Sequence, residues 1–112
     1  MQPSCNRRVG RRRKAKQSTK VICLKGCLGL GRNIALSVLD VSEAGACLIV
    51  KELLTPGQDV DLTFESEAVP RPVTRIGRVV WCLARQDGDY CIGVRFENFL
   101  PYMSWQSMTM SE

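Results

Sequence analysis

Apolar and polar residues alternate with a period of two over much of residues 33–97, the pattern of strands that are buried on one face. The clearest case is residues 59–65, where Val60, Leu62 and Phe64 alternate with polar neighbours. Residues 46–50 form a short continuous apolar run, which predicts a further strand. The pattern therefore predicts an antiparallel β-structure around one core.

Four further strands are predicted, each with apolar residues on one common face. The first covers residues 19–24. For the other three, the residues expected to share the inward face are Ile34, Leu36 and Val38; Val73, Gly77, Val79, Trp81 and Leu83; and Tyr90, Ile92, Val94 and Phe96.

Short turns separate these strands, at Pro56-Gly57 and at Asp87-Gly88. Six strands with no helix between them predict an all-β fold, a six-stranded antiparallel β-barrel over residues 21–98, because closure removes aggregation-prone edges. In residues 99–112, Pro101 suits a first helical position and the apolar content suits a short C-terminal helix and tail. We expect residues 1–112 to form a single domain.

Charge is distributed very unevenly. Residues 1–20 hold eight basic residues and no acid, whereas residues 21–112 hold eight basic residues and eleven acids, a net charge of −3. A cation-rich segment with few apolar residues is expected to be a mobile arm that seeks phosphate, whether on nucleic acid, on a membrane surface or on a small ligand. No apolar secretory segment follows the arm and no run is long enough to span a membrane, so we expect a cytoplasmic protein.

Several kinds of chemistry are disfavoured by the residue types present. The chain has six cysteines, no Cys-x-x-Cys pair and no histidine, so we expect reduced cysteines and no metal site. There are no paired carboxylates at catalytic spacing and no nucleophile beside a base. We therefore expect a protein that is not an enzyme and that has no cofactor.

One turn carries a candidate binding site. In Asp40-Val41-Ser42-Glu43-Ala44-Gly45, a carboxylate and a hydroxyl two residues apart share one side of an extended chain. Gly45, three residues after Ser42, permits a positive φ where the chain reverses. The alternative interpretation is a turn that only satisfies its own backbone.

Four ordered motifs resemble the PilZ domain. They are an Arg-x-x-x-Arg motif within the arm, Asp40-x-Ser42-x-x-Gly45, Gly77-Arg78-Val79-Val80-Trp81, and Gly93-Val94-Arg95-Phe96. The resemblance extends from about residue 7 to residue 99. It implies a six-stranded β-barrel with a C-terminal helix and a bacterial receptor for the second messenger cyclic di-GMP.

The resemblance implies ligand-binding roles for Arg8, Arg12, Asp40, Ser42 and Gly45. Arg7 and Arg11 satisfy the arginine motif equally well, so this alternative register stays open. Residue chemistry agrees with the ligand, because a guanidinium pairs with phosphate, matches the O6/N7 edge of guanine and stacks on a purine. A carboxylate at Asp40 would accept hydrogen bonds from the guanine N1 and N2 hydrogens.

A second hypothesis is a small β-barrel that binds nucleic acid through its basic tail. The acidic body and the low count of seven aromatic residues make nucleic acid a less suitable partner, since no stacking platform is evident. For a cyclic di-GMP receptor, we expect ligand binding to order the arm and a downstream protein to read the new surface. The sequence leaves open that partner, its pathway, the ligand stoichiometry and whether the protein is a monomer or a dimer.

Overall fold

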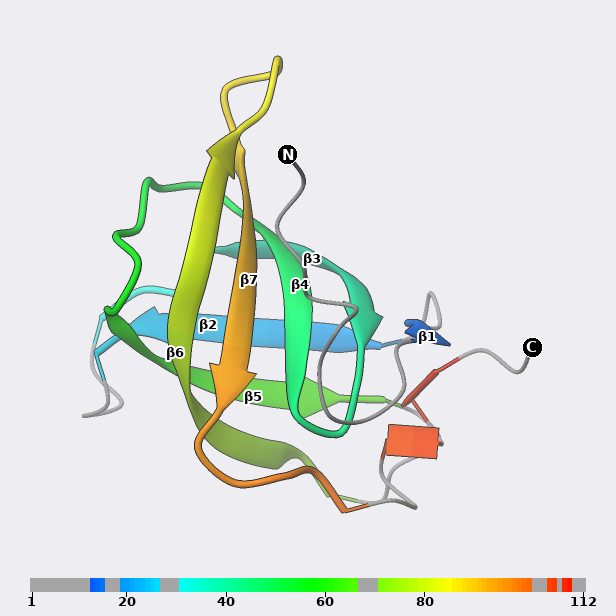
Figure 1. The fold of residues 1–112 in the computed structure, drawn as a ribbon. Coiled ribbons are helices and arrows are strands. Elements are labelled where there is room, and N and C mark those ends of the chain that lie inside the picture. Colours follow the sequence, from blue (N-terminus) through cyan, green and yellow to red (C-terminus); the bar gives the residue numbers. More distant parts are fainter. Residues whose placement is uncertain are drawn as a thin grey trace.

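The computed structural model describes residues 13–15, 19–26, 31–66, 71–101, 105–106 and 108–109, and these form one antiparallel β-sheet (Figure 1). The strands are β1 (Arg13–Lys14), β2 (Lys20–Lys25), β3 (Ala35–Val41), β4 (Gly45–Val50), β5 (Asp59–Glu65), β6 (Val73–Ala84) and β7 (Tyr90–Phe96). Their order in the sheet is β1-β3-β4-β7-β6-β5-β2. Part of the predicted arm, residues 13–15 and 19–20, belongs to this fold.

The sheet curls into a half-barrel and does not close with a ladder of hydrogen bonds. β2 pairs only with β5, and β3 pairs with β4 and with the two residues of β1. β2 and β3 meet at one end, where the Ile34 amide donates to the Cys23 carbonyl at 2.9 Å. The all-β antiparallel prediction is confirmed, but the closed six-stranded barrel is wrong. The described residues form seven strands, and no ladder joins β2 to β3.

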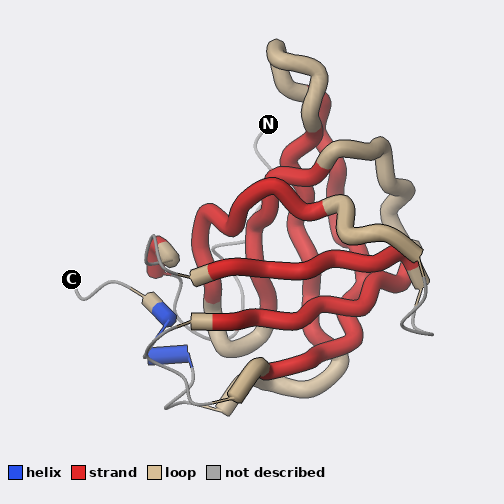
Figure 2. The backbone as a smooth tube through the Cα atoms, turned by 180° about the vertical axis from the view of Figure 1, so that it is seen from behind, coloured by secondary structure: helices blue, strands red, loops and turns tan. Residues whose placement is uncertain are grey.

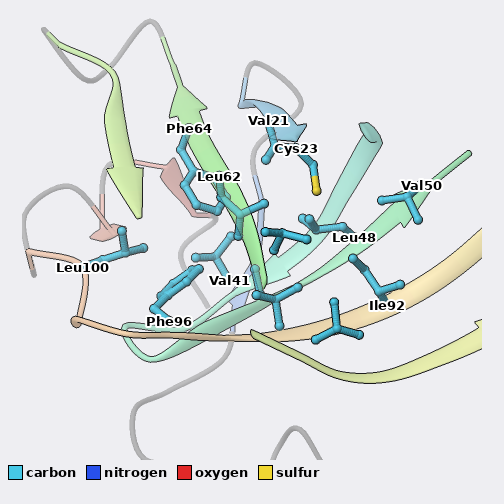
Figure 3. Close-up of a cluster of buried hydrophobic side chains, with 14 of the residues drawn as sticks. Val21, Cys23, Val41, Leu48, Val50, Leu62, Phe64, Ile92, Phe96 and Leu100 are labelled. Atoms are coloured by element: carbon cyan, nitrogen blue, oxygen red, sulfur yellow. The ribbon is translucent and has the colours of Figure 1, made fainter. Parts of the chain in front are cut away.

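One hydrophobic core fills the inside of the half-barrel (Figure 3). Val60, Leu62 and Phe64 are fully buried, as their alternation predicts, and residues 46–50 are buried throughout. The rings of Phe64 and Phe96 pack edge to face with centroids 5.7 Å apart. Burial, with a smaller effect from Asp61, raises the pKa of the Cys23 thiol to about 12, so this cysteine acts as an apolar core residue.

Register shifts in β3 and β6 explain why the inward faces predicted for these strands are partly wrong. β3 is irregular between Ala35 and Ser37 and again between Val38 and Asp40, and Leu36 is left 48% exposed. β6 shifts between Val79 and Trp81. An extra residue in one strand inverts the alternation beyond it.

The consequence in β6 is that the prediction of one continuous face is wrong. Val79 lies in the core, but beyond the shift Cys82 packs against the core and Leu83 is 48% exposed. Trp81 pairs with Gly93 on the outer face of the sheet.

Both predicted glycine turns are confirmed. Gly57 has φ of 94° in the turn closed by the Gln58 amide and the Thr55 carbonyl, and Gly88 has φ of 91° in the hairpin between β6 and β7. A positive φ is the conformation that glycine adopts without steric cost.

Two described residues of the C-terminal segment pack in the hydrophobic core. Trp105 and Met108 are fully buried, and the Trp105 indole Nε1–H donates to the Val41 carbonyl at 2.8 Å. The short C-terminal helix predicted within residues 99–112 is not confirmed by the structure. Only residues 105, 106 and 108 have helical geometry among those described, and Figure 2 shows the described chain mainly as strand and loop.

The two tryptophans differ in a way that can be measured. We expect Trp105→Phe to lower the free energy of unfolding by about 1–3 kcal/mol, because the buried Val41 carbonyl loses its donor. Trp81→Phe serves as the matched control, since the buried Nε1 of Trp81 has no acceptor among the described residues. This variant should therefore lose less free energy of unfolding. Urea unfolding of both variants measures the difference; an equal loss in the two would contradict the anchoring role of Trp105.

Candidate functional site

Asp40 lies near the end of β3, half-buried, between two neighbouring strands. It pairs across the sheet with Lys14 of β1 on one side and with Cys47 of β4 on the other. Residues that are directly opposite in adjacent strands present their side chains on the same face. The carboxylate therefore belongs to the outer face, away from the core.

Ser42 forms the centre of the turn that joins β3 to β4. Its side chain is fully buried, and its hydroxyl oxygen accepts from the Ala44 amide at 3.2 Å and the Gly45 amide at 3.0 Å. The hydroxyl also donates to the Gly45 carbonyl at 3.3 Å, and the Ser42 amide donates to the same carbonyl at 2.8 Å. In this structure the Ser42 side chain fixes the shape of the turn beside Asp40.

Gly45 begins β4, and its φ is not positive, so the turn does not use the positive φ that a glycine permits. The requirement for glycine comes from a neighbouring strand instead. A Cβ at this position would overlap the Val94 carbonyl oxygen of β7. Gly45 therefore lets β4 and β7 approach closely directly after the turn.

A row of directly paired residues crosses five adjacent strands on the outer face. In sheet order these residues, which we name the Asp40 row, are Lys14, Asp40, Cys47, Gly93 and Trp81. The indole of Trp81 lies over Gly93, where any side chain would overlap its Nε1 and Cε2 atoms. The row thus has a carboxylate near one end, an aromatic plane at the other and small side chains between.

Sequence reasoning missed Trp81 because alternation placed it inside the core. The register shift before it turns the indole to the face that carries Asp40. Its Nε1 is buried and has no hydrogen-bond acceptor among the described residues. A buried donor without a partner costs free energy, so the position of this indole against Gly93 is maintained by packing and not by a hydrogen bond.

Arginines from the body of the sheet add positive charge next to the Asp40 row. Arg95 pairs with Gly45 on one side and with Arg78 on the other, and both arginines are exposed. Arg78 forms an ion pair with Asp59 at 3.4 Å. Two like charges directly opposite each other are unfavourable unless an anion lies close by.

The root of the arm is held at the same end of β3. Arg13 pairs with Val41, and its guanidinium lies 4.6 Å from the centroid of the Trp105 ring, a cation–π contact. The Ala15 amide donates to the Leu39 carbonyl at 3.2 Å. The candidate ligand residues Arg8 and Arg12, and the alternatives Arg7 and Arg11, lie outside the described residues.

Neither a metal cluster nor a membrane helix is found in the part of the chain that is described. No group of three or more acidic or cysteine side chains there could hold a metal ion. No helix there is long and apolar enough to cross a membrane. Cys23 and Cys82 are free thiols, and Cys5 and Cys27 lie outside the described residues.

Comparison with known proteins assigns the family. The family model described as PilZ domain matches residues 10–101, which is most of the chain and includes every element of the described sheet. A search among curated proteins found no significant match. PilZ domains are receptors that bind cyclic di-GMP as a ligand rather than as a cofactor. The extent of the match shows that this chain belongs to the PilZ domain family.

Proposed function

We propose that the chain is a cyclic di-GMP receptor that binds its ligand over the Asp40 row on the outer face of the sheet. The observation that carries the proposal is this row: in a PilZ domain, the carboxylate of Asp40 and the indole of Trp81 share one face with only small residues between them. An anion with a flat base needs a plane to stack on, an acceptor for its donors and nearby cations. Trp81, Asp40 and the exposed Arg95 belong to one face of the sheet and could supply all three.

Guanine recognition falls to the two ends of the row. The Asp40 carboxylate accepts hydrogen bonds from guanine N1–H and N2–H, a pattern that adenine does not offer. The Trp81 indole supplies an aromatic plane, and base–aromatic stacking contributes about 1–3 kcal/mol per base.

Phosphate recognition falls to the arginine arm, with Arg8 and Arg12 as the proposed pair and Arg7 and Arg11 as the alternative register. We infer that ligand binding extends β1 towards the N-terminus. Since side chains alternate along a strand and Lys14 shares the face of Asp40, such an extension would bring Arg12 to that face as well. This alternation supports Arg12 over Arg11.

Ser42 and Gly45 support the site through the backbone of the β3–β4 turn. The Ser42 hydroxyl would have to exchange one of its bonds within the turn to contact the ligand, so its main contribution is to hold the turn that follows Asp40. Gly45 brings β4 against β7, which aligns the part of the row that β4 and β7 supply.

The output of the receptor is a change in the arm. The proposed phosphate ligands lie on the arm and the proposed base ligands lie on the sheet, so closing the arm over the nucleotide presents a new surface that a downstream protein in the cytoplasm can read. In this role the chain acts as an adaptor with no catalytic step and no metal.

The arginine pair is tested by calorimetry with cyclic di-GMP. We expect Arg8→Ala with Arg12→Ala to weaken binding at least about 100-fold, because two charge-assisted contacts are lost, each worth about 1.5–3 kcal/mol. The melting temperature should stay close to that of the unchanged chain. The control, Arg71→Ala with Arg85→Ala, removes the same charge from the exposed body and should bind normally.

Three outcomes of this experiment are informative. Equal weakening in the control pair would point to nonspecific polyanion binding, which titration with single-stranded RNA would then reveal. Loss of binding in Arg7→Ala with Arg11→Ala, but not in the first pair, would select the other register. An unfolded first pair would assign the arm a structural role.

The role of Asp40 is tested by base selectivity. We expect the unchanged chain to prefer cyclic di-GMP over cyclic di-AMP, which carries the same phosphodiesters but not the guanine N1 and N2 donors. Asp40→Ala should weaken cyclic di-GMP binding by about 10- to 100-fold and narrow the difference between the two nucleotides. Asp87→Ala, in the hairpin between β6 and β7, is the control. An unchanged preference in Asp40→Ala would remove Asp40 from base recognition.

A further inference from the structure

The arm root, residues 13–15, is held on the edge of the sheet by few contacts with β3. The two residues of β1 pair with Val41 and Asp40, and the Ala15 amide donates to the Leu39 carbonyl at 3.2 Å. So short an edge strand is easily lost, because its few hydrogen bonds contribute little free energy against the entropy of ordering the chain. The arm root therefore depends on support from another part of the molecule.

The C-terminal segment is anchored in the body of the fold. Its described residues, which we name the clamp, are Trp105, Gln106, Met108 and Thr109. Trp105 and Met108 are fully buried in the core. The Trp105 indole donates to the Val41 carbonyl at 2.8 Å, and the buried Thr19 hydroxyl, directly before β2, donates to the Met108 carbonyl at 2.9 Å. Loss of either bond leaves a buried polar group unsatisfied, so both resist movement of the clamp.

The clamp also contacts the arm root, beside which it lies in Figure 1. The Arg13 guanidinium is 4.6 Å from the centroid of the Trp105 ring, and Ala15 forms an antiparallel backbone bridge with Thr109. The buried Thr109 hydroxyl donates to the Trp105 carbonyl at 2.9 Å, which ties these two contacts together. Through the clamp, the arm root is thus connected to the hydrophobic core.

We propose that the clamp holds the arm root where the arm can reach the nucleotide, so that Trp105 is a positioning residue for cyclic di-GMP binding. This inference rests on the proposed function. The Trp105 indole donates to Val41, the residue after Asp40. Its ring contacts Arg13, the residue after Arg12 of the proposed arginine pair. One buried side chain therefore fixes the start of the arm relative to the carboxylate.

The clamp acts on affinity without a contact to the ligand. If the arm root is docked in only a fraction of the molecules, the apparent dissociation constant rises by the inverse of that fraction. Every nucleotide that uses the arm is affected by the same factor. Weakening the clamp therefore lowers the affinity for cyclic di-GMP and for cyclic di-AMP equally, whereas loss of a direct base contact changes the preference between them.

Calorimetry with both nucleotides tests the proposal on the full chain. Thr19→Val removes the hydrogen bond to Met108 but keeps the shape of the side chain. We expect it to weaken cyclic di-GMP binding about three- to tenfold, the effect of one lost hydrogen bond, with an unchanged preference over cyclic di-AMP. Val60→Ala is the control, because it destabilises the core at β5 without touching the clamp. Its urea midpoint should fall while its affinity stays that of the unchanged chain.

Direct attraction of phosphate by Arg13 is the competing explanation, and a double substitution separates the two roles. Arg13→Gln should weaken binding about threefold, and Arg13→Lys, which keeps a cation over the ring, should restore most of the loss. In a Trp105→Leu background, which has no ring for the cation, Arg13→Gln should cause no further loss. An equal loss in both backgrounds would assign Arg13 to the phosphate and overturn the positioning role of Trp105.

Hydrogen exchange of the free chain tests the clamp without any nucleotide. The Ala15 amide reports on the arm root, because it donates to the Leu39 carbonyl. We expect Thr19→Val to speed its exchange at least about threefold, whereas the Ile34 amide, which donates to the Cys23 carbonyl, should change much less. This measurement leaves Trp105 in place, so it decides the proposal even where Trp105→Leu does not fold.

The contrary results are equally defined. Unchanged exchange of the Ala15 amide in Thr19→Val, or an affinity loss in Val60→Ala as large as that in Thr19→Val, would overturn this inference. Normal cyclic di-GMP binding that Thr19→Val leaves unchanged would overturn it alone and leave the proposed function standing. Absence of cyclic di-GMP binding in the unchanged chain would overturn the proposed function and the inference together.

Discussion

The close approach of β4, β7 and β6 at two glycines is the constraint on which the outer face depends. Gly45 leaves space for the Val94 carbonyl, and Gly93 leaves space for the Trp81 indole. A methyl group at either position would force strands or ring apart in the middle of the sheet. Because both close approaches are possible, Asp40 and Trp81 lie on the same face of the sheet although forty residues of chain separate them.

The same end of β3 connects the proposed ligand site to the rest of the molecule. Val41, next to Asp40, pairs with Arg13 and accepts the indole hydrogen of Trp105. Arg13 in turn lies over the Trp105 ring. Arg13, the first described residue of the arm, thus contacts both the strand that bears the carboxylate and Trp105 of the C-terminal segment. A movement of the arm on ligand binding would therefore change the contacts of β3 and of Trp105.

Much of the fold follows from local pattern. Val60, Leu62 and Phe64 alternate and are buried, and glycine with a neighbouring proline or aspartate marks two turns correctly. The failures have a common cause in contacts between distant residues. No residue type announces the register shift before Trp81, and the need for glycine at residue 45 comes from Val94, far along the chain. The pairing of the two outermost strands, which decides whether a barrel closes, is equally invisible to local pattern.

The candidate site was predictable in part. The Asp40 turn stands out as a motif, whereas Trp81 could be assigned to the site only once strand pairing was known. The arginine pair stays a prediction, because it lies outside the described residues. Sequence therefore identifies the polar groups of the site better than the surface on which the ligand is proposed to lie.

The most direct measurement is a titration of the isotopically labelled protein with cyclic di-GMP, followed by nuclear magnetic resonance of its amide groups and tryptophan side chains. The account predicts that the largest shifts fall on residues 7–14, on Asp40, Cys47 and Gly93, and on the Nε1–H of Trp81, with β2 and β5 little changed. Shifts centred on β2 and β5, or a Trp81 Nε1–H signal that does not move at saturation, would contradict it.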